Sequence, residues 1–272
     1  MNRKQFLKNT TTVFLLLAGG KIVKAGESWM NDSSKRKLKL RFAVASDGHY
    51  GQPNTEFDNF FTTAVDHINK AHQVNPFAFC VINGDLIHNE KQLLVRAKEK
   101  VDRLAMPYYV TKGNHDMVSD DYWNEVWKMP ANHYAVVNNT GLILATTSNE
   151  KGEYLAPDLN WMKTKLEDGK KLKNVFIFIH IPQTKWTKNA IETPAFFDLL
   201  KNYSNVKAVF HGHEHDQDGI KVKDNISYLF DAHFGGSWGT NYKGFRVVEL
   251  FDDDTVATYI MNPVEKINSA EL

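Results

Sequence analysis

Five apolar runs in this sequence each end directly in a short polar motif built from Asp, Asn, His and Gly. The runs alternate with segments whose apolar residues recur at helical spacing, which predicts an α/β core. In an open α/β sheet, ligands bind outside the carboxyl ends of the strands. We therefore expect the five motifs to meet at one rim of a sheet. In chain order they are Asp47-Gly48-His49, Gly84-Asp85, Gly113-Asn114-His115-Asp116, His180 and Gly212-His213-Glu214-His215.

The apolar pattern also predicts where the individual elements lie. Strands are expected at 38–46, 77–83, 108–111, 175–179 and 206–210. Helices are expected at 57–71, with Asn54 as a candidate cap, and at 93–104, 120–128, 157–167 and 193–200. A hairpin is expected to join 133–137 to 142–147 around Asn138-Asn139, and 220–222, 226–230, 245–250 and 255–261 are expected to form consecutive antiparallel strands. Alternation followed by such a meander predicts mixed sheets.

Composition excludes several classes of protein. The chain has 272 residues, of which 42% are hydrophobic, so it is long enough to bury a sizeable core and is not disordered. Its formal net charge of +1 lacks the electrostatic signature of a nucleic-acid-binding protein. Cys80 is the single cysteine, which excludes an intramolecular disulfide and a cysteine-based zinc site. Without internal repeats or low-complexity linkers, residues 26–272 are expected to form one domain.

Residues 1–25 have the pattern of an export signal peptide. A basic start is followed by the apolar stretch 11–20, which is too short to span a bilayer, and by a small-x-small cleavage site at Val23-Lys24-Ala25. An ordinary N-terminal helix is the alternative, but no acidic residue precedes Glu27. Residues 3–8 resemble a twin-arginine export signal with Lys4 in place of the second arginine. We expect an exported protein, in the bacterial periplasm or secreted, without a stable membrane anchor.

Removal of this leader changes the charge of the protein. The leader carries five basic side chains and no acidic one, so the net charge falls from +1 to −4 over residues 26–272. We expect attraction for an anionic ligand to come from bound metal rather than from surface lysines. The basic residues of the leader are Arg3, Lys4, Lys8, Lys21 and Lys24.

The side chains of the five motifs point to a metal centre. Taken singly, Asp-x-His, Gly-Asp or Gly-Asn-His-Asp is explained as a turn, and Gly-His-x-His is the more specific signal. Together, and each at a strand end, they supply carboxylate, amide and imidazole ligands that suit Mn, Zn, Fe or similar ions. Seven such side chains exceed one tetrahedral site and suit two ions that share a bridging ligand.

This ordered set of motifs resembles the calcineurin-like metallophosphoesterase superfamily, and the resemblance extends from Leu40 to the last strands. It implies two mixed β-sheets packed as a sandwich and flanked by helices, with a site for two divalent or trivalent metal ions. By this resemblance one ion is held by Asp47, His49, Asp85 and His215. Asp85 also bridges to the second ion, which is completed by Asn114, His180 and His213.

The resemblance implies hydrolysis of a small phosphorylated substrate. Two cations clamp the phosphate, and a water held between them loses a proton and acts as the nucleophile. His115 is then the candidate acid that protonates the leaving group. For Asp116 two roles remain open at this point: it orients the His115 imidazole, or it only caps the loop.

Departures from known branches narrow the activity. The sequence after Asp85 lacks the Asp-Arg-Gly of protein Ser/Thr phosphatases, and His88 stands where purple acid phosphatases have a tyrosine ligand. We interpret His88 as a loop residue or a neighbour of the ligands. The pattern is closest to bacterial phosphodiesterases, including cyclic-nucleotide-type enzymes. The alternatives are a phosphomonoesterase, a nucleotide pyrophosphatase, or a non-catalytic scaffold of the same fold.

Two loops supply candidate substrate-binding residues. Trp186 lies in the loop after His180, and Trp238 and Tyr242 lie in the glycine-rich segment 233–244. Each aromatic ring is expected either to stack on a flat leaving group or to pack against the sheet edge. Asn114 is a candidate for substrate contact as well. We expect Trp123 and Trp127 to be core residues, Cys80 to be a buried thiol, and the histidines outside the five motifs to be bystanders.

Overall fold

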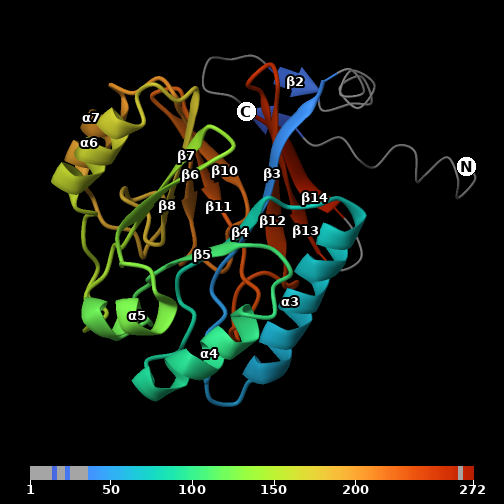
Figure 1. Ribbon diagram of the computed structural model, residues 1–272, viewed down its shortest axis with the longest axis vertical. Helices are drawn as coiled ribbons and strands as arrows, with labels where there is room; N and C mark the ends of the chain where they lie inside the picture. Colours follow the sequence, from blue (N-terminus) through green and yellow to red (C-terminus); the bar gives the residue numbers. More distant parts are fainter. Residues whose placement is uncertain (1–13, 17–21, 25–35, 263–265) are drawn as a thin grey trace, which may run out of the picture.

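Two six-stranded sheets pack face to face in the computed structural model, which describes residues 14–16, 22–24, 36–262 and 266–272. In one sheet the strand order is β14-β13-β12-β3-β4-β5, and in the other it is β10-β11-β9-β8-β7-β6. Figure 1 shows the two sheets side by side, with helices on their outer faces. This is the α/β sandwich that the family resemblance implies, so the predicted fold class is confirmed.

The first sheet is parallel on one side and antiparallel on the other. β3 (Leu38–Ala45), β4 (Phe79–Asn83) and β5 (Tyr108–Thr111) run parallel to one another. β12 (Phe245–Phe251) pairs antiparallel with β3 and with β13 (Val256–Met261), and β13 pairs antiparallel with β14 (Lys266–Glu271). The pattern did not predict β14, whose residues Lys266–Glu271 show no run of apolar side chains.

The second sheet has a parallel centre and antiparallel edges. Its central strands are β7 (Thr140–Ala145), β8 (Asn174–Ile179), β9 (Val206–His211) and β11 (Ile226–Phe230). β6 (His133–Val137) and β10 (Ile220–Lys223) form the antiparallel edges. Asn138 and Asn139 have φ values of 47° and 61°, the left-handed conformation of a tight hairpin turn, so the predicted hairpin is confirmed.

The predicted C-terminal meander is wrong. β10 and β11 do pair antiparallel, but β11 also pairs parallel with β9, whereas β12 and β13 belong to the other sheet. The segment 231–244 therefore crosses from one sheet to the other. Strand periodicity reports which face of a strand is buried and contains no information about which neighbour it pairs with, which is why the pattern failed here.

The core between the sheets is built from aromatic side chains. Phe42 of β3 stacks on Phe79 of β4 with ring centroids 4.7 Å apart, and it meets Phe176 and Phe178 of β8 edge-on. All four side chains are fully buried. Because helices also cover the outer faces, the central strands are buried on both sides and appear in the sequence as continuous apolar runs.

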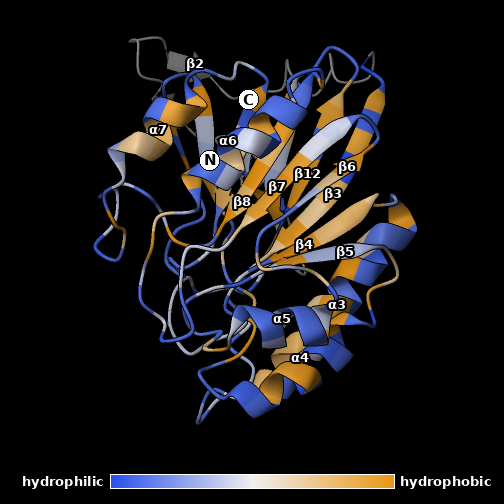
Figure 2. Ribbon diagram, turned by 60° about the vertical axis from the view of Figure 1, so that its left-hand side comes forward, coloured by the Kyte–Doolittle hydropathy of each residue, from blue (hydrophilic) through white to orange (hydrophobic). Residues whose placement is uncertain are grey.

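Helices cover each outer face. On the first sheet lie α3 (Phe57–Val74), the short η2 (Lys91–Leu93), α4 (Leu94–Val101) and α5 (Asp120–Trp127), and Trp123 and Trp127 are buried beneath α5 as predicted. On the second sheet lie α6 (Leu159–Asp168) and α7 (Pro194–Leu200). Figure 2 shows mostly hydrophobic strands and helices that mix hydrophobic with hydrophilic residues, and the buried apolar residues of α3 are Phe61, Val65 and Ile68. The predicted cap at Asn54 is wrong, because α3 begins at Phe57, after Glu56, without a side-chain cap.

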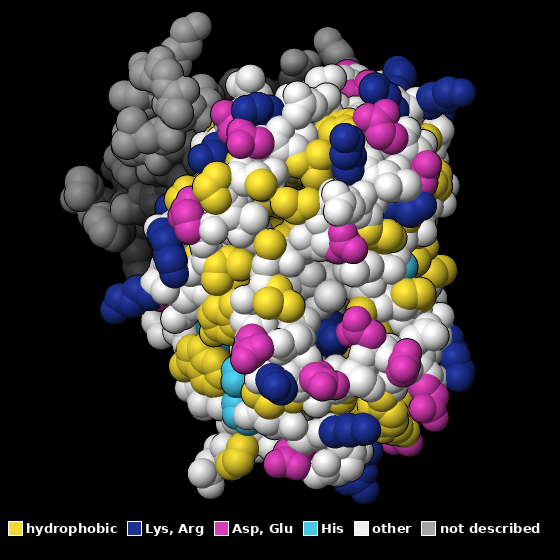
Figure 3. All heavy atoms as spheres, turned by 90° about the vertical axis from the view of Figure 1, so that its left-hand side faces the viewer, with side chains coloured by type: hydrophobic (Ala, Val, Ile, Leu, Met, Phe, Trp, Pro, Cys, Tyr) yellow, Lys and Arg dark blue, Asp and Glu magenta, His cyan; other side chains and the backbone are white. Residues whose placement is uncertain are grey.

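Most of the predicted leader, 1–25, lies outside the described residues. Within it, β1 (Phe14–Leu16) pairs antiparallel with β2 (Ile22–Lys24). Among the described residues, no helix combines the length and apolarity needed to cross a membrane. On the face shown in Figure 3, lysine and arginine side chains are interspersed with acidic ones and form no single-sign field.

Candidate metal centre

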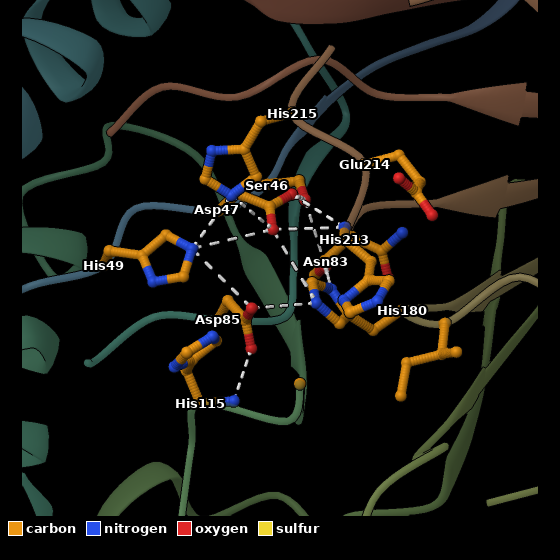
Figure 4. Close-up of polar contacts among 12 residues, drawn as sticks. Ser46, Asp47, His49, Asn83, Asp85, His115, His180, His213, Glu214 and His215 are labelled. Atoms are coloured by element: carbon orange, nitrogen blue, oxygen red, sulfur yellow. Dashed lines mark hydrogen bonds and ion pairs between the residues drawn. The ribbon is translucent and has the colours of Figure 1, made fainter. Parts of the chain in front are cut away.

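The carboxyl ends of five parallel strands deliver the predicted site residues to one place. Asp47 and His49 follow β3, Asp85 follows β4, and Asn114 follows β5 of the first sheet. From the second sheet, His180 follows β8, and the pair His213 and His215 follows β9. Figure 4 shows six of these side chains pointing toward one another, those of Asp47, His49, Asp85, His180, His213 and His215. Residues up to 168 positions apart in sequence, from Asp47 to His215, thus converge between the ends of the two sheets.

The backbone is strained where it presents these ligands. Asp47, His49, Asp85 and His213 have φ values of 59°, 48°, 53° and 71°, in the left-handed region that side-chain-bearing residues seldom adopt. Hydrogen bonds hold these turns: the Asp47 amide donates to the Gly84 carbonyl (3.1 Å), and the His49 amide donates to the Asp85 carbonyl (2.9 Å). Strained backbone of this kind persists at functional sites because the surrounding structure enforces it.

Gly84 is required by close approach. Its φ is +86°, and a Cβ atom added there would overlap the imidazole of His180. Any side chain at this position would therefore displace His180 from the cluster. The Gly-Asp motif, which is a weak signal in the sequence, is thereby explained. The glycine leaves room for the His180 ring, and the aspartate lies among the imidazoles.

A first group of ligands surrounds one side of the centre. The donor atoms of Asp47, His49 and His215 lie within 4.8 Å of one another, and all three residues are buried. His49 Nε2 is 2.9 Å from His215 Nε2, and His215 Nε2 is 3.2 Å from Asp47 Oδ1. Two imidazole nitrogens that both present lone pairs at this distance repel one another unless a proton or a cation lies between them. The donor set therefore fits a metal ion.

A second group lies on the other side. The donor atoms of Asp85, His180 and His213 are also within 4.8 Å of one another. His180 Nε2 is 3.1 Å from Asp85 Oδ2, and the same oxygen is 3.7 Å from His49 Nε2. Asp85 thus lies between the two groups, where a bridging ligand is expected.

Two buried atoms of the residues predicted to bind the second ion have no hydrogen-bond partner: Asn114 Oδ1 and His213 Nε2. Buried polar atoms are nearly always satisfied, and an orphan needs an explanation such as an ion. Both atoms come from residues that the family resemblance places on one ion. Their lone pairs fit a second cation adjacent to Asp85.

The electrostatics of the cluster differ from one imidazole to the next. Burial lowers the pKa of His49 to about 3 and that of His213 to about 4, so both rings are neutral and able to bind a metal. Burial acts on His180 in the same direction, but the Asp85 and Asp47 carboxylates outweigh it and raise its pKa to about 10. For Asp47 and Asp85, burial acts to raise the pKa, but the neighbouring histidines outweigh burial, so the pKa of each carboxyl is lowered.

His115 lies beside this centre, and the structure decides between the two roles considered for Asp116. The Asp116 carboxylate accepts hydrogen bonds from the amides of Gly113 and Ile87, both at 2.9 Å, so it holds the loop. The prediction that Asp116 orients His115 as part of the catalytic set is wrong. The nearest partner of His115 Nδ1 is instead Asn89 Oδ1, at 2.8 Å. A lone Asn in a loop gives no sequence signal for such a role.

His88 is closer to the centre than a bystander. Its ring stacks on His115 with centroids 4.7 Å apart and planes 11° apart, and its Nδ1 is 3.0 Å from Nδ1 of His49. The interpretation as a neighbour of the ligands therefore describes its position. A ligand imidazole needs a partner on its second nitrogen to fix its tautomer, and for His49 that partner is His88.

Of the three aromatic candidates, one reaches the site. The indole of Trp238 stacks on the His215 ring at 4.2 Å, and the backbone carbonyl of Trp238 accepts a hydrogen bond from His215 Nδ1 (3.2 Å). Trp238 is 45% exposed. For Trp186 the substrate-stacking role is wrong and the packing alternative is confirmed, because it packs against Phe197 and Tyr228 at the outer face of the second sheet.

For Tyr242 the substrate-stacking role is also wrong. Its hydroxyl donates to the Asp218 carboxylate instead of facing the ligands. Tyr154, which the sequence did not single out, meets the His213 ring edge-on at 4.9 Å. Cys80 is buried in β4 with a raised pKa, as expected for an inert thiol.

Comparisons with known proteins agree with this geometry. A family model described as calcineurin-like phosphoesterase matches residues 40–217. A dimetal phosphatase from Danio rerio has a similar structure, with 13% identity, a TM-score of 0.70, and coverage of 86% of this chain and 99% of that one. GAP50, the anchor in the inner membrane complex of Plasmodium, has 16% identity, a TM-score of 0.63, and coverage of 87% and 89%.

A purple acid phosphatase from yellow lupin seeds has 12% identity and a TM-score of 0.63 over 85% of this chain, which spans about half of that longer protein (53%). No curated protein matches in sequence. At these low identities the structural likeness shows only the fold. The family assignment rests on the family model, which matches residues 40–217.

The contrast between His180 and the other imidazoles makes metal binding proton-linked. At pH 7 His180 carries a proton that an ion must displace, whereas His49 and His213 do not. We expect metal binding to wild type to release about one proton more than binding to His180→Gln. Calorimetric titrations in buffers of different ionisation enthalpy measure this difference. Equal proton release from the two proteins would contradict the assignment.

Proposed function

The chain belongs to the calcineurin-like phosphoesterase family, and we propose that within it this protein is an exported phosphodiesterase. The coarser activity, metal-dependent phosphoester hydrolysis, follows from the family and from the two Asp/His groups of the site. The observation that carries the proposal is the pair of buried ligand groups with Asp85 between them. Two metal ions at such a site neutralise the phosphate oxygens and activate water for in-line attack.

The protein's own residues assign the two ion positions. Asp47, His49 and His215 would hold one ion, and His180, His213 and Asn114 would hold the other, with Asp85 contacting both. All of these except the half-buried His213 have less than a tenth of their surface exposed, so bulk water does not compete for the donor atoms. Metal identity is Mn, Fe, Zn or a similar ion, since nitrogen and oxygen donors suit each of these.

His115 is the residue we propose as the proton donor to the leaving group. Its backbone amide donates to Oδ1 of Asp85, the proposed bridging ligand, at 2.8 Å, and its side chain is only partly buried and accessible to substrate. With Nδ1 donating to Asn89 Oδ1, the imidazolium form of His115 carries its second proton on Nε2, and this is the proton that would pass to the leaving-group oxygen and leave a neutral ring. No serine or cysteine nucleophile is required.

Trp238 supports a substrate with a flat group. Its exposed indole lies directly over His215, so a base or aryl group stacked on it would place an attached phosphate near the ligands. This exposed indole, called the Trp238 shelf below, suits a diester with a nucleoside or aryl group. Cyclic nucleotides are the substrate class that we favour. Phosphomonoesters and nucleotide pyrophosphates are the alternative substrates.

Export is proposed from the leader alone. Residues 1–25 combine a basic start, a short apolar stretch and a small-residue cleavage site. The mature protein would then carry a net charge of −4, so phosphate would be attracted by bound cations rather than by a basic surface. N-terminal sequencing of protein recovered from the periplasm, showing a start after residue 25, is the direct check.

The proposed activity is tested by hydrolysis of bis-nitrophenyl phosphate before and after chelation. We expect the chelated protein to lose activity and to regain it with Mn²⁺, Zn²⁺ or Fe²⁺, while Asp85→Asn regains none because the shared ligand has lost its charge. A spectrophotometric assay with a metal analysis of each sample measures both effects. If no ion restored hydrolysis, the proposed activity would be contradicted and the alternative of a non-catalytic scaffold of the same fold would be favoured.

Replacement of His115 separates its proton donation from metal binding. His115→Ala should lower kcat roughly 10²–10⁴-fold for alkyl diesters, whose leaving groups need a proton, and far less for nitrophenyl diesters. His67→Ala, at a half-buried position of α3 outside both ligand groups, is the matched control and should change neither rate. Equal losses for both leaving groups would remove His115 from the role of acid.

Replacement of Trp238 tests the shelf. Stacking of a base on an aromatic ring contributes about 1–3 kcal/mol, so Trp238→Ala should raise KM for a cyclic nucleotide roughly 5- to 150-fold. The same variant should keep its KM for a dialkyl phosphate, and Trp238→Phe should retain most of the nucleotide affinity. An unchanged KM for the nucleotide would show that the substrate does not use this ring.

A further inference from the structure

An aspartate and an arginine are buried side by side beneath the metal centre, where the two sheets meet, and burial raises the pKa of the aspartate, Asp231, to about 8. Asp231 directly follows β11 of the second sheet, and Arg246 belongs to β12 of the first; their side chains are fully buried. Arg246 Nε lies 3.8 Å from Asp231 Oδ1. The guanidinium also donates to the carbonyls of Phe230 and Asp218, both at 2.7 Å, so it fastens one sheet to the other.

Asp231 connects this pair to the last residue of β4, Asn83. The Asn83 side-chain amide donates to Asp231 Oδ2 (2.8 Å), and Asn83 Oδ1 accepts a hydrogen bond from the Thr111 hydroxyl (2.8 Å). The side chain of Asn83 is therefore held from two directions. Asn83 is followed by Gly84 and Asp85, so this anchor sits at the start of a ligand-bearing turn.

The main chain of Asn83 reaches the ligands directly, as Figure 4 shows. Its carbonyl oxygen accepts a hydrogen bond from His180 Nδ1 at 2.7 Å. It also accepts one from the Ser46 hydroxyl (3.3 Å), next to Asp47. A proton on Nδ1 leaves the lone pair of His180 on Nε2, which is the nitrogen that faces Asp85.

The same pair supports the Gly-His-Glu-His motif. The Asp231 amide donates to the carbonyl of His211 (2.9 Å), the last residue of β9 and the second residue before His213. Asp231 thus contacts, through one side chain and one amide, the segments that carry Asp85 and His213. Both of these residues belong to the second group of ligands.

A contribution to stability does not by itself explain why Asp231 and Arg246 are buried together. Burying two charges is expensive, and well-packed apolar replacements of a buried ion pair are often neutral or stabilising. Removal of a partner that orients a metal ligand, in contrast, typically lowers metal affinity 10- to 100-fold. We propose that Asp231 and Arg246 are positioning residues that fix Asn83 and thereby hold His180 in the orientation that binds the second ion. This inference rests on the proposed metal centre.

The test compares variants by calorimetric titration of Zn²⁺ into the metal-free full-length protein. The double variant Asp231→Leu/Arg246→Met removes both charges and leaves neither unpaired. We expect one of the two binding steps to weaken about 10- to 100-fold and the other to keep its affinity. The unfolding temperature of the metal-free protein should fall as well, because the Phe230 and Asp218 carbonyls and the Asn83 side-chain amide lose their partners, and Arg41→Met measures what such a fall alone does to binding. Asp231→Asn retains an acceptor for Asn83 and should weaken the same step less.

Arg41→Met is the matched control. Arg41 is also buried and ion-paired, with Glu249 of β12 at 3.0 Å, but it lies in β3 well before Asp47. It should lower the unfolding temperature and leave both binding steps unchanged. In the zinc-loaded wild type, nitrogen-15 spectra should show His180 protonated on Nδ1 and its exchange slowed by Asn83, and the double variant should lose this protection.

Two results would overturn the inference. One is a double variant that binds both ions as wild type does, with the His180 signature intact. The other is equal weakening of both steps in the double variant and in Arg41→Met, which would indicate a general loss of stability. If the double variant does not fold, Asp231→Asn carries the same comparison. Failure of wild type itself to bind two ions would instead contradict the proposed metal centre.

Discussion

The arrangement of the whole ligand cluster depends on two buried carboxylates, those of Asp47 and Asp85. Oxygens of both lie within 4 Å of the same imidazole nitrogens, those of His49 and His180, and burial would expel such charges unless positive charge were nearby. A proton on His180 supplies that charge without a metal, and bound cations would supply more. The ligand donors that lack hydrogen-bond partners are a consequence of the same arrangement.

Holding these charges together requires the scaffold to absorb strain. Four of the ligand residues adopt positive φ, Gly84 leaves room for the His180 ring, and the strand-end amides satisfy neighbouring carbonyls. The aromatic core between the sheets is rigid enough to enforce these conformations because its side chains are interlocked and fully buried. The buried Asp231 and Arg246 lie between that core and the ligands, at the junction of the two sheets.

Much of the site followed from local pattern. Asp, Asn and His residues placed directly after apolar strands converge wherever parallel strands share a carboxyl edge, so seven ligand candidates could be proposed without a structure. The roles of Asp116, Trp186 and Tyr242 could not, because the Gly113 and Ile87 amides, the outer face of the second sheet and the Asp218 carboxylate take up their side chains. The contacts of Asn89 with His115 and of His88 with His49 were equally invisible.

The sequence by itself determined the alternation of strands and helices, the polar residues at the strand ends and the chemistry of their donor atoms, since these depend on neighbours in the chain. Only the tertiary structure decided how segment 231–244 divides the last strands between two sheets and which aromatic ring faces the ligands. It also brought Asp231 and Arg246 together with Asn83 beneath His180. Such contacts join residues up to 148 positions apart, as from Asn83 to Asp231, and no local periodicity encodes them, because they form only when the two sheets pack.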